Sequence, residues 1–172
     1  MQKTIEEIND KQSIELLKEL HILTRDGKIN QDSRRKLKQV YHLYNFIEPL
    51  LKDLLNSNTD LTLVDHGAGK SYLGFIIYDL FYKNLKSAGH VYGIETRSAL
   101  VEKSIELQKK LNFSNMSFFN LSVAESIISD KLPQKIDIVT ALHACDTATD
   151  DAIQFALKKK AQYILINKQM SK

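Results

Sequence analysis

The sequence has little of several residue types, and each shortage excludes a class of protein. Cysteine occurs once, at Cys145, so no disulfide can form within the chain and a reducing compartment is expected. Only two prolines and six glycines occur, too few for a collagen-like or low-complexity protein. No apolar run approaches the roughly 20 residues of a membrane-spanning helix, and the polar start lacks a signal-peptide core. We therefore expect a soluble cytoplasmic protein without a membrane partner.

An excess of charge of either sign is missing as well. The formal net charge is +3 over 172 residues, with 43% hydrophobic and 26% charged residues, which is typical of one globular unit. The net charge alone therefore does not predict a nucleic-acid binder. Basic residues do gather before the middle of the chain, where they either grip phosphates or form a solvated helix face interleaved with acids. This basic cluster comprises Arg25, Lys28, Arg34, Arg35, Lys36 and Lys38.

Two regions of different patterning follow one another. Apolar residues recur at helical spacing in 5–20 and again in 33–55, where Asp32 or Ser33 is predicted to cap the helix and Pro49 to kink or split it. From residue 57 onward short apolar runs alternate with helical stretches. We therefore predict an N-terminal helical extension over 1–56 and an α/β domain over 57–172.

The alternation in the second region predicts the fold class. Val-, Ile- and Leu-rich runs without a clean two-residue period are typical of strands buried on both faces of a parallel sheet. Helical stretches between them place helices on both faces by right-handed crossovers, and ligands of such sheets bind beyond the carboxyl ends of the strands. The five predicted strands are 61–65, 91–95, 116–119, 136–141 and 163–166.

The turn after the first strand, Asp65-His66-Gly67-Ala68-Gly69, can be compared with three ligand-binding motifs, and it matches only one of them at every required position. A P-loop requires a glycine where Val64 stands, and the dinucleotide fingerprint requires a third glycine where Tyr72 stands. An S-adenosylmethionine (SAM) turn needs only an acid followed by x-Gly-x-Gly. A tight strand-to-helix turn without a ligand is the structural alternative.

The SAM template assigns further residues to the cofactor. Glycines at 67 and 69, with Ala68 between them, allow close backbone approach, and the following helix offers free N–H groups to a carboxylate. Asp65 is predicted to face the methionine ammonium, and Glu95, ending the second strand, to accept bonds from the ribose hydroxyls. The residues that follow the third strand, Asn120 and Leu121, are predicted to lie at the adenine.

The loop after the fourth strand carries the candidate catalytic residues. His143 is predicted to act as a base or to orient the acceptor, and Asp146 to lie near the transferred methyl group. The structural alternative is that His143 caps a strand end and that the next helix is capped by Asp146, Thr147 or Thr149. Together with His66 and Cys145 these residues match no compact zinc spacing, so no metal is expected.

Three segments resemble one family of class I SAM-dependent methyltransferases, which includes methyltransferase-like proteins labelled as ribosomal RNA adenine dimethylase-like. The segments are 65–70, 92–95 and above all 141–153, Ala-Leu-His-Ala-Cys-Asp-Thr-Ala-Thr-Asp-Asp-Ala-Ile. The resemblance covers roughly 34–166. It implies SAM as cofactor, with Asp65, Gly67, Gly69 and Glu95 around it and residues 143–146 near the methyl group.

The sequence departs from this family in two places. Ser71 stands where a small residue, often glycine, follows the lysine, and the two strands expected after the fifth are missing. Either the chain is a fragment, or the exposed edge of 163–166 pairs with another chain, as in a homo-oligomer, or the domain is a degenerate relative. We predict a SAM-dependent methyltransferase acting on RNA, a protein or a small molecule. The alternative is a non-catalytic or truncated SAM-fold module that acts in binding or assembly.

Overall fold

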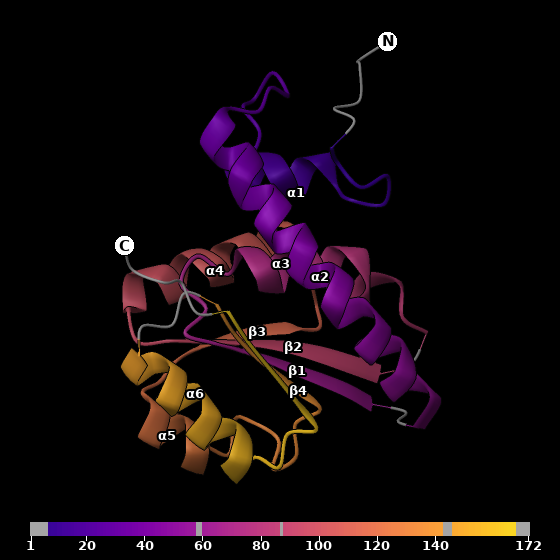
Figure 1. Ribbon diagram of the computed structural model, residues 1–172. Coiled ribbons are helices and arrows are strands. Elements are labelled where there is room, and N and C mark those ends of the chain that lie inside the picture. The colour runs from indigo at the N-terminus through magenta and orange to yellow at the C-terminus, as the bar shows by residue number, and fades with distance from the viewer. Residues whose placement is uncertain (1–6, 58–59, 87, 143–145, 168–172) are drawn as a thin grey trace.

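The sheet has the predicted parallel arrangement. In the computed structural model (Figure 1) the strands of the described residues lie in the order β3-β2-β1-β4-β5. The structure describes residues 7–57, 60–86, 88–142 and 146–167, without the side chains of 146, 147 and 167. This arrangement confirms the predicted fold class. The strands are β1 (Asp60–His66), β2 (Ala88–Glu95), β3 (Met116–Asn120), β4 (Ile138–Leu142) and β5 (Tyr163–Asn167).

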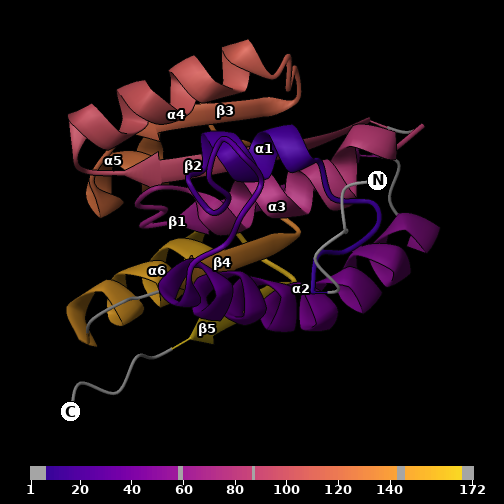
Figure 2. The same ribbon diagram turned by 90° about the horizontal axis from the view of Figure 1, so that it is seen from above.

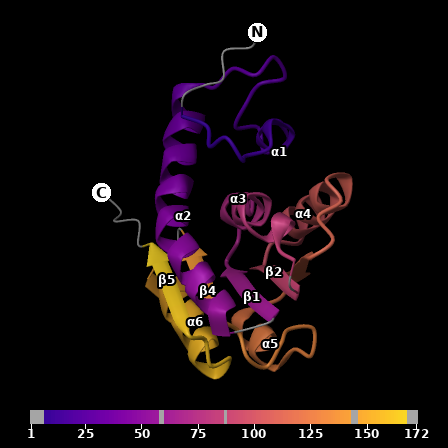
Figure 3. The same cartoon turned by 90° about the vertical axis from the view of Figure 1, so that its right-hand side faces the viewer.

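Helices cover both faces of this sheet, as Figures 1 and 3 show. On one face lie α2 (Gln31–Ser57), α3 (Tyr72–Leu80) and α4 (Ser98–Lys110). On the other lie α5 (Val123–Ile128) and α6 (Asp146–Lys158). The short helix α1 (Ile14–Glu19) precedes them, and a 3₁₀ turn (Tyr82–Asn84) follows α3.

The central strand β1 divides the core into two layers. Leu61 and Leu63 belong to the cluster shared with α1 to α4, whereas Val64 belongs to the cluster beneath α5 and α6. All three side chains are fully buried because β1 pairs with β2 on one side and β4 on the other. Burial on both faces explains why the strand is apolar without a clean alternation.

The long helix α2 corrects two expectations. Its first turn is capped by Asn30, whose Oδ1 accepts from the Ser33 backbone N–H at 2.8 Å, so neither Asp32 nor Ser33 is the cap. Pro49 lies inside the helix and does not split it. The physical reason is its placement on the exposed face, where the carbonyl it leaves free can bond water, while Ile47 and Leu51 hold the opposite face in the core.

The N-terminal region is less helical than predicted, because the helix expected over 5–20 is confined to α1. Ser13 begins it by accepting from the Leu16 backbone N–H at 3.2 Å. The segment before it is fixed by Asp79 of α3, which accepts from the Gln12 side chain and, at 2.7 Å, from the Ser13 backbone N–H. α1 therefore lies against α3, as Figure 2 also shows. The predicted boundary after residue 56 stays a prediction.

One further boundary, the start of β4, differs from the prediction. β4 begins two residues later than expected, after the Asp137 backbone N–H has donated to the Thr62 hydroxyl. α4 begins after Arg97, whose guanidinium has no acceptor for the first N–H groups and donates to Glu95. α6 begins at Asp146. Among the described residues, no helix combines the length and hydropathy that a bilayer span requires.

Candidate active site

Asp65 lies at the point where the strand order reverses, beside both β2 and β4. It is aligned with Gly93 and Thr140, and the Thr140 hydroxyl donates to its Oδ1 at 2.9 Å. Its side chain is buried at 3% exposure. Burial raises the pKa of Asp65 to about 7, with the Thr140 hydrogen bond opposing and the Glu95 charge adding to the rise. A carboxylate held this way is ready for a cationic partner.

The glycine turn after β1 is formed by residues with left-handed backbone conformation. Gly67 and Gly69 have φ of 69° and 58°, and Ser71 has φ of 56°. The Ala68 N–H donates to the Ile94 carbonyl at 2.9 Å, which ties the turn to the end of β2. The two glycines adopt a conformation that costs other residues energy, whereas Ser71 bears that cost at the start of α3.

Gly93 of β2 must also be a glycine, but for a different reason. A Cβ added there would lie 2.5 Å from the Phe118 ring, so only glycine lets that ring pack across β2. The same Cβ would lie 3.6 Å from the Ala68 methyl group. The packing under the turn therefore depends on Gly93. The sequence analysis treated this residue only as part of a strand. An isolated glycine in a strand indicates that another group packs closely against the backbone, and this signal could have identified it.

Glu95 lies at the end of β2 as predicted, and its carboxylate already has donors. Gly69 N–H donates to Oε2 at 2.8 Å, and Arg97 donates from its backbone N–H and its guanidinium at 3.0 Å each. Burial raises the pKa of Glu95, but these hydrogen bonds outweigh it and bring the pKa to about 2. Glu95 is therefore ionised, and Arg97 occupies the oxygens that a ribose would need.

Asn120, which ends β3, and Leu121, which follows it, have separate roles. The Asn120 side chain donates to the carbonyls of Glu95 and Thr96 at 2.9 and 2.8 Å, so it holds the loop that follows β2. Leu121 lines a cavity together with Glu95. Asn120 thus supports the predicted site through the backbone, whereas Leu121 forms part of its wall.

Two adjoining cavities of about 310 Å³ each lie along the carboxyl ends of the strands. The turn cavity is bounded by Asp65, the glycine turn and α2, and the strand-end cavity by Glu95, Leu121 and the start of α6. Both are lined by Gly67, Arg97 and Leu142, so they meet at the glycine turn. The structure therefore brings Asp65, residues 67–69, Glu95 and Leu121 together around one connected space.

His66 was considered only as a metal ligand in the sequence, yet it belongs to this site. Its ring lines the strand-end cavity and lies 5.1 Å from the Phe155 ring. Its Nε2 is buried and has no hydrogen-bond partner among the described residues. Burial lowers the pKa of His66, against the charges of Asp151 and Glu95, so the ring is neutral at pH 7. The signal in the sequence was its position directly before the glycine turn.

The predicted catalytic residues cannot be placed. His143 lies outside the described residues, and Asp146 begins α6 without a described side chain. The described part of the chain contains no cluster of three metal-ligating residues, but Cys145 also lies outside it. The roles of His143 and Asp146 therefore stay predictions.

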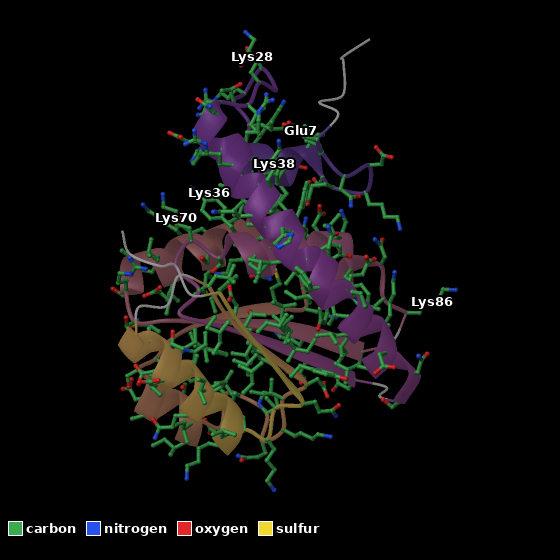
Figure 4. All side chains as sticks on the ribbon, viewed as in Figure 1. Glu7, Lys28, Lys36, Lys38, Lys70 and Lys86 are labelled. Carbon is green, nitrogen blue, oxygen red and sulfur yellow. The ribbon has the colours of Figure 1, made fainter. Side chains whose placement is uncertain are left out.

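Most residues of the basic cluster are in ion pairs. Lys38 and Arg34 both reach Glu7, at 3.1 and 3.3 Å, and Figure 4 shows Lys38 beside Glu7. Lys28 pairs with Asp26 at 2.8 Å, and Arg35 approaches Asp32 at 3.8 Å. These pairs favour the solvated helix face. Lys36 differs, because its ammonium lies 4.6 Å from the centre of the Tyr72 ring at the turn cavity.

Solved methyltransferase structures share this fold at low sequence identity. A precorrin-6y C5,15-methyltransferase from Geobacter metallireducens is 19% identical, with a TM-score of 0.51 over 64% of this chain and 55% of that one. TrmK from M. capricolum, solved with S-adenosyl-homocysteine, is 12% identical, with a TM-score of 0.47 over 66% and 48%. An rRNA methylase from Streptococcus thermophilus is 13% identical, with a TM-score of 0.45 over 59% and 56%.

The extent of these matches is limited, since the chain aligns with about half the length of the structures that it resembles. No curated protein sequence matches it significantly. A family of sequences described as a methyltransferase domain does match, over residues 35–167, which includes α2 from its first turn, the glycine turn and all five described strands. The chain therefore belongs to this methyltransferase-domain family, as predicted.

Proposed function

We propose that this domain binds SAM across the turn cavity and the strand-end cavity and catalyses methyl transfer to an acceptor. The observation that carries the proposal is the connection of these cavities at the glycine turn, with Asp65 in one and Glu95 in the other. When bound, SAM supplies an electrophilic methyl group on its sulfonium. The chain's own residues bind it, orient it and exclude water.

The residues present fit such a cofactor. Asp65 is buried with a raised pKa, so an ammonium beside it restores the ionised form and gains a strong partner. Gly67 leaves open space where a side chain would stand, because no atom lies within 4 Å of an added Cβ. Glu95 accepts ribose hydroxyls once the Arg97 guanidinium swings away, and its backbone carbonyl stays anchored by Asn120. Leu121 covers the adenine.

The remaining assignments extend the same proposal. His143 and Asp146 follow β4 and act on the acceptor, with His143 orienting it or accepting its proton. On the motif over 141–153 we propose that the protein is related to the methyltransferases labelled as ribosomal RNA adenine dimethylase-like. We place its activity in the cytoplasm and its cofactor-binding residues within 57–172.

A second candidate, assembly through β5, is favoured by one observation. Within the described residues β5 pairs only with β4, and Ile164 on it is 37% exposed. A second copy that covers this edge would give a homo-oligomer or a binding module. Sedimentation of the wild type and of Ile164→Lys tests it, because the variant should remain a monomer at concentrations at which the wild type dimerises.

Calorimetric titration of SAM and S-adenosylhomocysteine tests the main proposal. We expect micromolar binding of both, and at least tenfold weaker binding by Glu95→Ala because the ribose loses its acceptor. Glu106→Ala, which removes an exposed carboxylate on α4, is the matched control and should bind as the wild type does. Absence of binding to folded wild-type protein would refute the proposal.

A further inference from the structure

A third cavity adjoins the proposed cofactor site on its far side. This helix cavity, of about 280 Å³, lies between the end of α1, the start of α3 and the middle of α4. Its wall includes His21, Phe75 and Lys103. Lys70 and Tyr72 line both the helix cavity and the turn cavity, so the two meet there. A ligand that enters the turn cavity from this side passes over Tyr72.

The charged side chains are distributed unevenly among these cavities. The strand-end cavity carries the acids Glu95 and Asp151, and its cation Arg97 is paired with Glu95. Within the described residues the only acid on the turn cavity is Asp65, which is buried and bonded to Thr140. The helix cavity, over the same part of the chain, has no acid in its wall. The balance of charged side chains therefore shifts from acidic at the strand ends to basic toward α4.

The lysines that line these cavities differ from the paired members of the basic cluster, although Lys36 belongs to both sets. Lys28 and Lys38 are paired with Asp26 and Glu7. No ion pair joins Lys36, Lys70 or Lys103 to a carboxylate in the described residues, and all three are exposed. Figure 4 shows Lys36 and Lys70 close together where α2 passes the glycine turn. These three ammonium groups are available to an anionic ligand.

Backbone groups add to the positive charge. α3 begins at Tyr72 and α4 at Ser98, and neither first turn receives a side-chain capping bond. The free N–H groups and the positive end of each helix dipole therefore lie beside the walls that contain Tyr72 and Leu100. The lysines alone would define a charged surface, but lysines around two connected cavities define an anion-binding path.

We propose that the methyl acceptor is a single-stranded nucleic acid whose phosphodiester backbone runs from the turn cavity over Tyr72 into the helix cavity. This inference rests on the proposed SAM site, which fixes where the acceptor atom must arrive. Lys36 and Lys70 hold the phosphate nearest the reacting nucleotide, and Lys103 holds a neighbouring phosphate. A strand is favoured over a small phosphorylated molecule because the free cations lie on both sides of Tyr72, which matches a repeating charge.

Fluorescence anisotropy with a short labelled single-stranded RNA, in the presence of S-adenosylhomocysteine, tests this path. We expect salt-dependent binding, and Lys103→Gln should weaken it several-fold and lower the slope of log K against log salt by about 0.7, the value for one phosphate contact on a single strand. Lys109→Gln removes an exposed lysine of the same helix that lines none of the three cavities, and it should bind as the wild type does.

Competition and cofactor titration separate the outcomes. Unlabelled single-stranded oligonucleotide should displace the probe at far lower concentration than a mononucleotide or inorganic phosphate. Equal displacement by the mononucleotide would overturn the strand in favour of a small phosphorylated acceptor. SAM binding by the wild type and by Lys103→Gln is measured in parallel and should be equal. Normal SAM binding without RNA binding, or equal losses in Lys103→Gln and Lys109→Gln, would refute this inference while the proposed cofactor site stands.

Discussion

Two buried carboxylates on neighbouring elements are held in opposite ways. Asp79, 1% exposed on α3, accepts from the Gln12 side chain and the Ser13 backbone N–H and pairs with Lys83 at 3.3 Å. Asp65, 3% exposed near the end of β1, accepts one hydrogen bond among the described residues, from the Thr140 hydroxyl at 2.9 Å, and its pKa rises to about 7. Asp79 thus joins the segment before α1 to α3. Asp65 has fewer donors and lies beside the turn cavity.

The difference shows where this fold tolerates unfavourable interactions. The region around Asp65 also contains the left-handed Ser71 and the buried Nε2 of His66, which has no hydrogen-bond partner in the part of the chain that the structure describes. Such features concentrate at functional sites, where a ligand supplies the missing partner. The α1–α3 junction has no cavity at Asp79 among those described, so its carboxylate is satisfied by the chain itself. Mutations in the two regions should therefore change stability in opposite directions.

The largest effect is expected at the junction. Asp79→Ala removes a buried acceptor and leaves the Ser13 N–H and the Gln12 amide without it, so the free energy of unfolding should fall by about 3–5 kcal/mol. Urea denaturation measures the change. Asp79→Asn keeps one acceptor oxygen and should lose less. Loss of under about 0.5 kcal/mol in the alanine variant would show that the junction does not stabilise the fold.

Asp65→Asn should have the opposite sign and should depend on pH. Because the folded pKa of Asp65 lies above its unfolded value of 3.8, the folded state binds the extra proton and stability falls as pH rises toward about 7. The variant removes this loss, so it should gain roughly 4 kcal/mol at pH 8 and little at pH 4. Urea titrations at both pH values measure the gain.

A matched control for this change is Asp60→Asn, which removes an exposed carboxylate from the other end of the same strand. It should leave stability nearly unchanged at both pH values. The same Asp65→Asn protein should bind SAM at least tenfold more weakly, because the ammonium loses its counter-ion. Destabilisation at pH 8 would contradict the claim that Asp65 is held unfavourably.

The pairing of Arg97 with Glu95 can be tested at the proposed cofactor site. Its guanidinium occupies both oxygens of Glu95, so Arg97→Gln should free them and tighten SAM binding about fivefold, the equivalent of one hydrogen bond. Calorimetry measures the affinity, and Arg97→Lys, which keeps the charge without the forked geometry, should lie between the two. Weaker binding in Arg97→Gln would mean that the guanidinium holds the ligand instead of competing with it.

The smallest effect concerns the strained turn. Ser71→Gly relieves a left-handed conformation but adds flexibility to the unfolded chain, so a net gain of about 0.5–1 kcal/mol is expected. Ser71→Ala keeps the Cβ and should gain nothing. Thermal denaturation of both variants distinguishes backbone strain from loss of the hydroxyl, since a gain in the alanine variant would point to the hydroxyl.

Local features of the sequence are sufficient to predict the main helices and strands and their order along the chain. The buried runs at 61–65 and 91–95, the left-handed turn at Gly67 and Gly69, and the acids that end both strands all follow local rules of burial and backbone sterics. Because parallel strands align their carboxyl ends, these local features also predicted the edge of the sheet at which the two cavities lie. The methyltransferase class followed from the same residues.

The hydrogen-bond and ion-pair partners of the charged and polar side chains, in contrast, depend on the tertiary structure. No local rule predicts that Arg97 closes on Glu95, that Glu7 neutralises Lys38, or that Asn120 holds the backbone of the neighbouring loop. Nor does sequence spacing show that Lys103 of α4 and Lys70 of the turn share a cavity. Hydrogen bonds and ion pairs depend on distances of a few ångströms between residues far apart in the chain, and only packing of the core sets those distances.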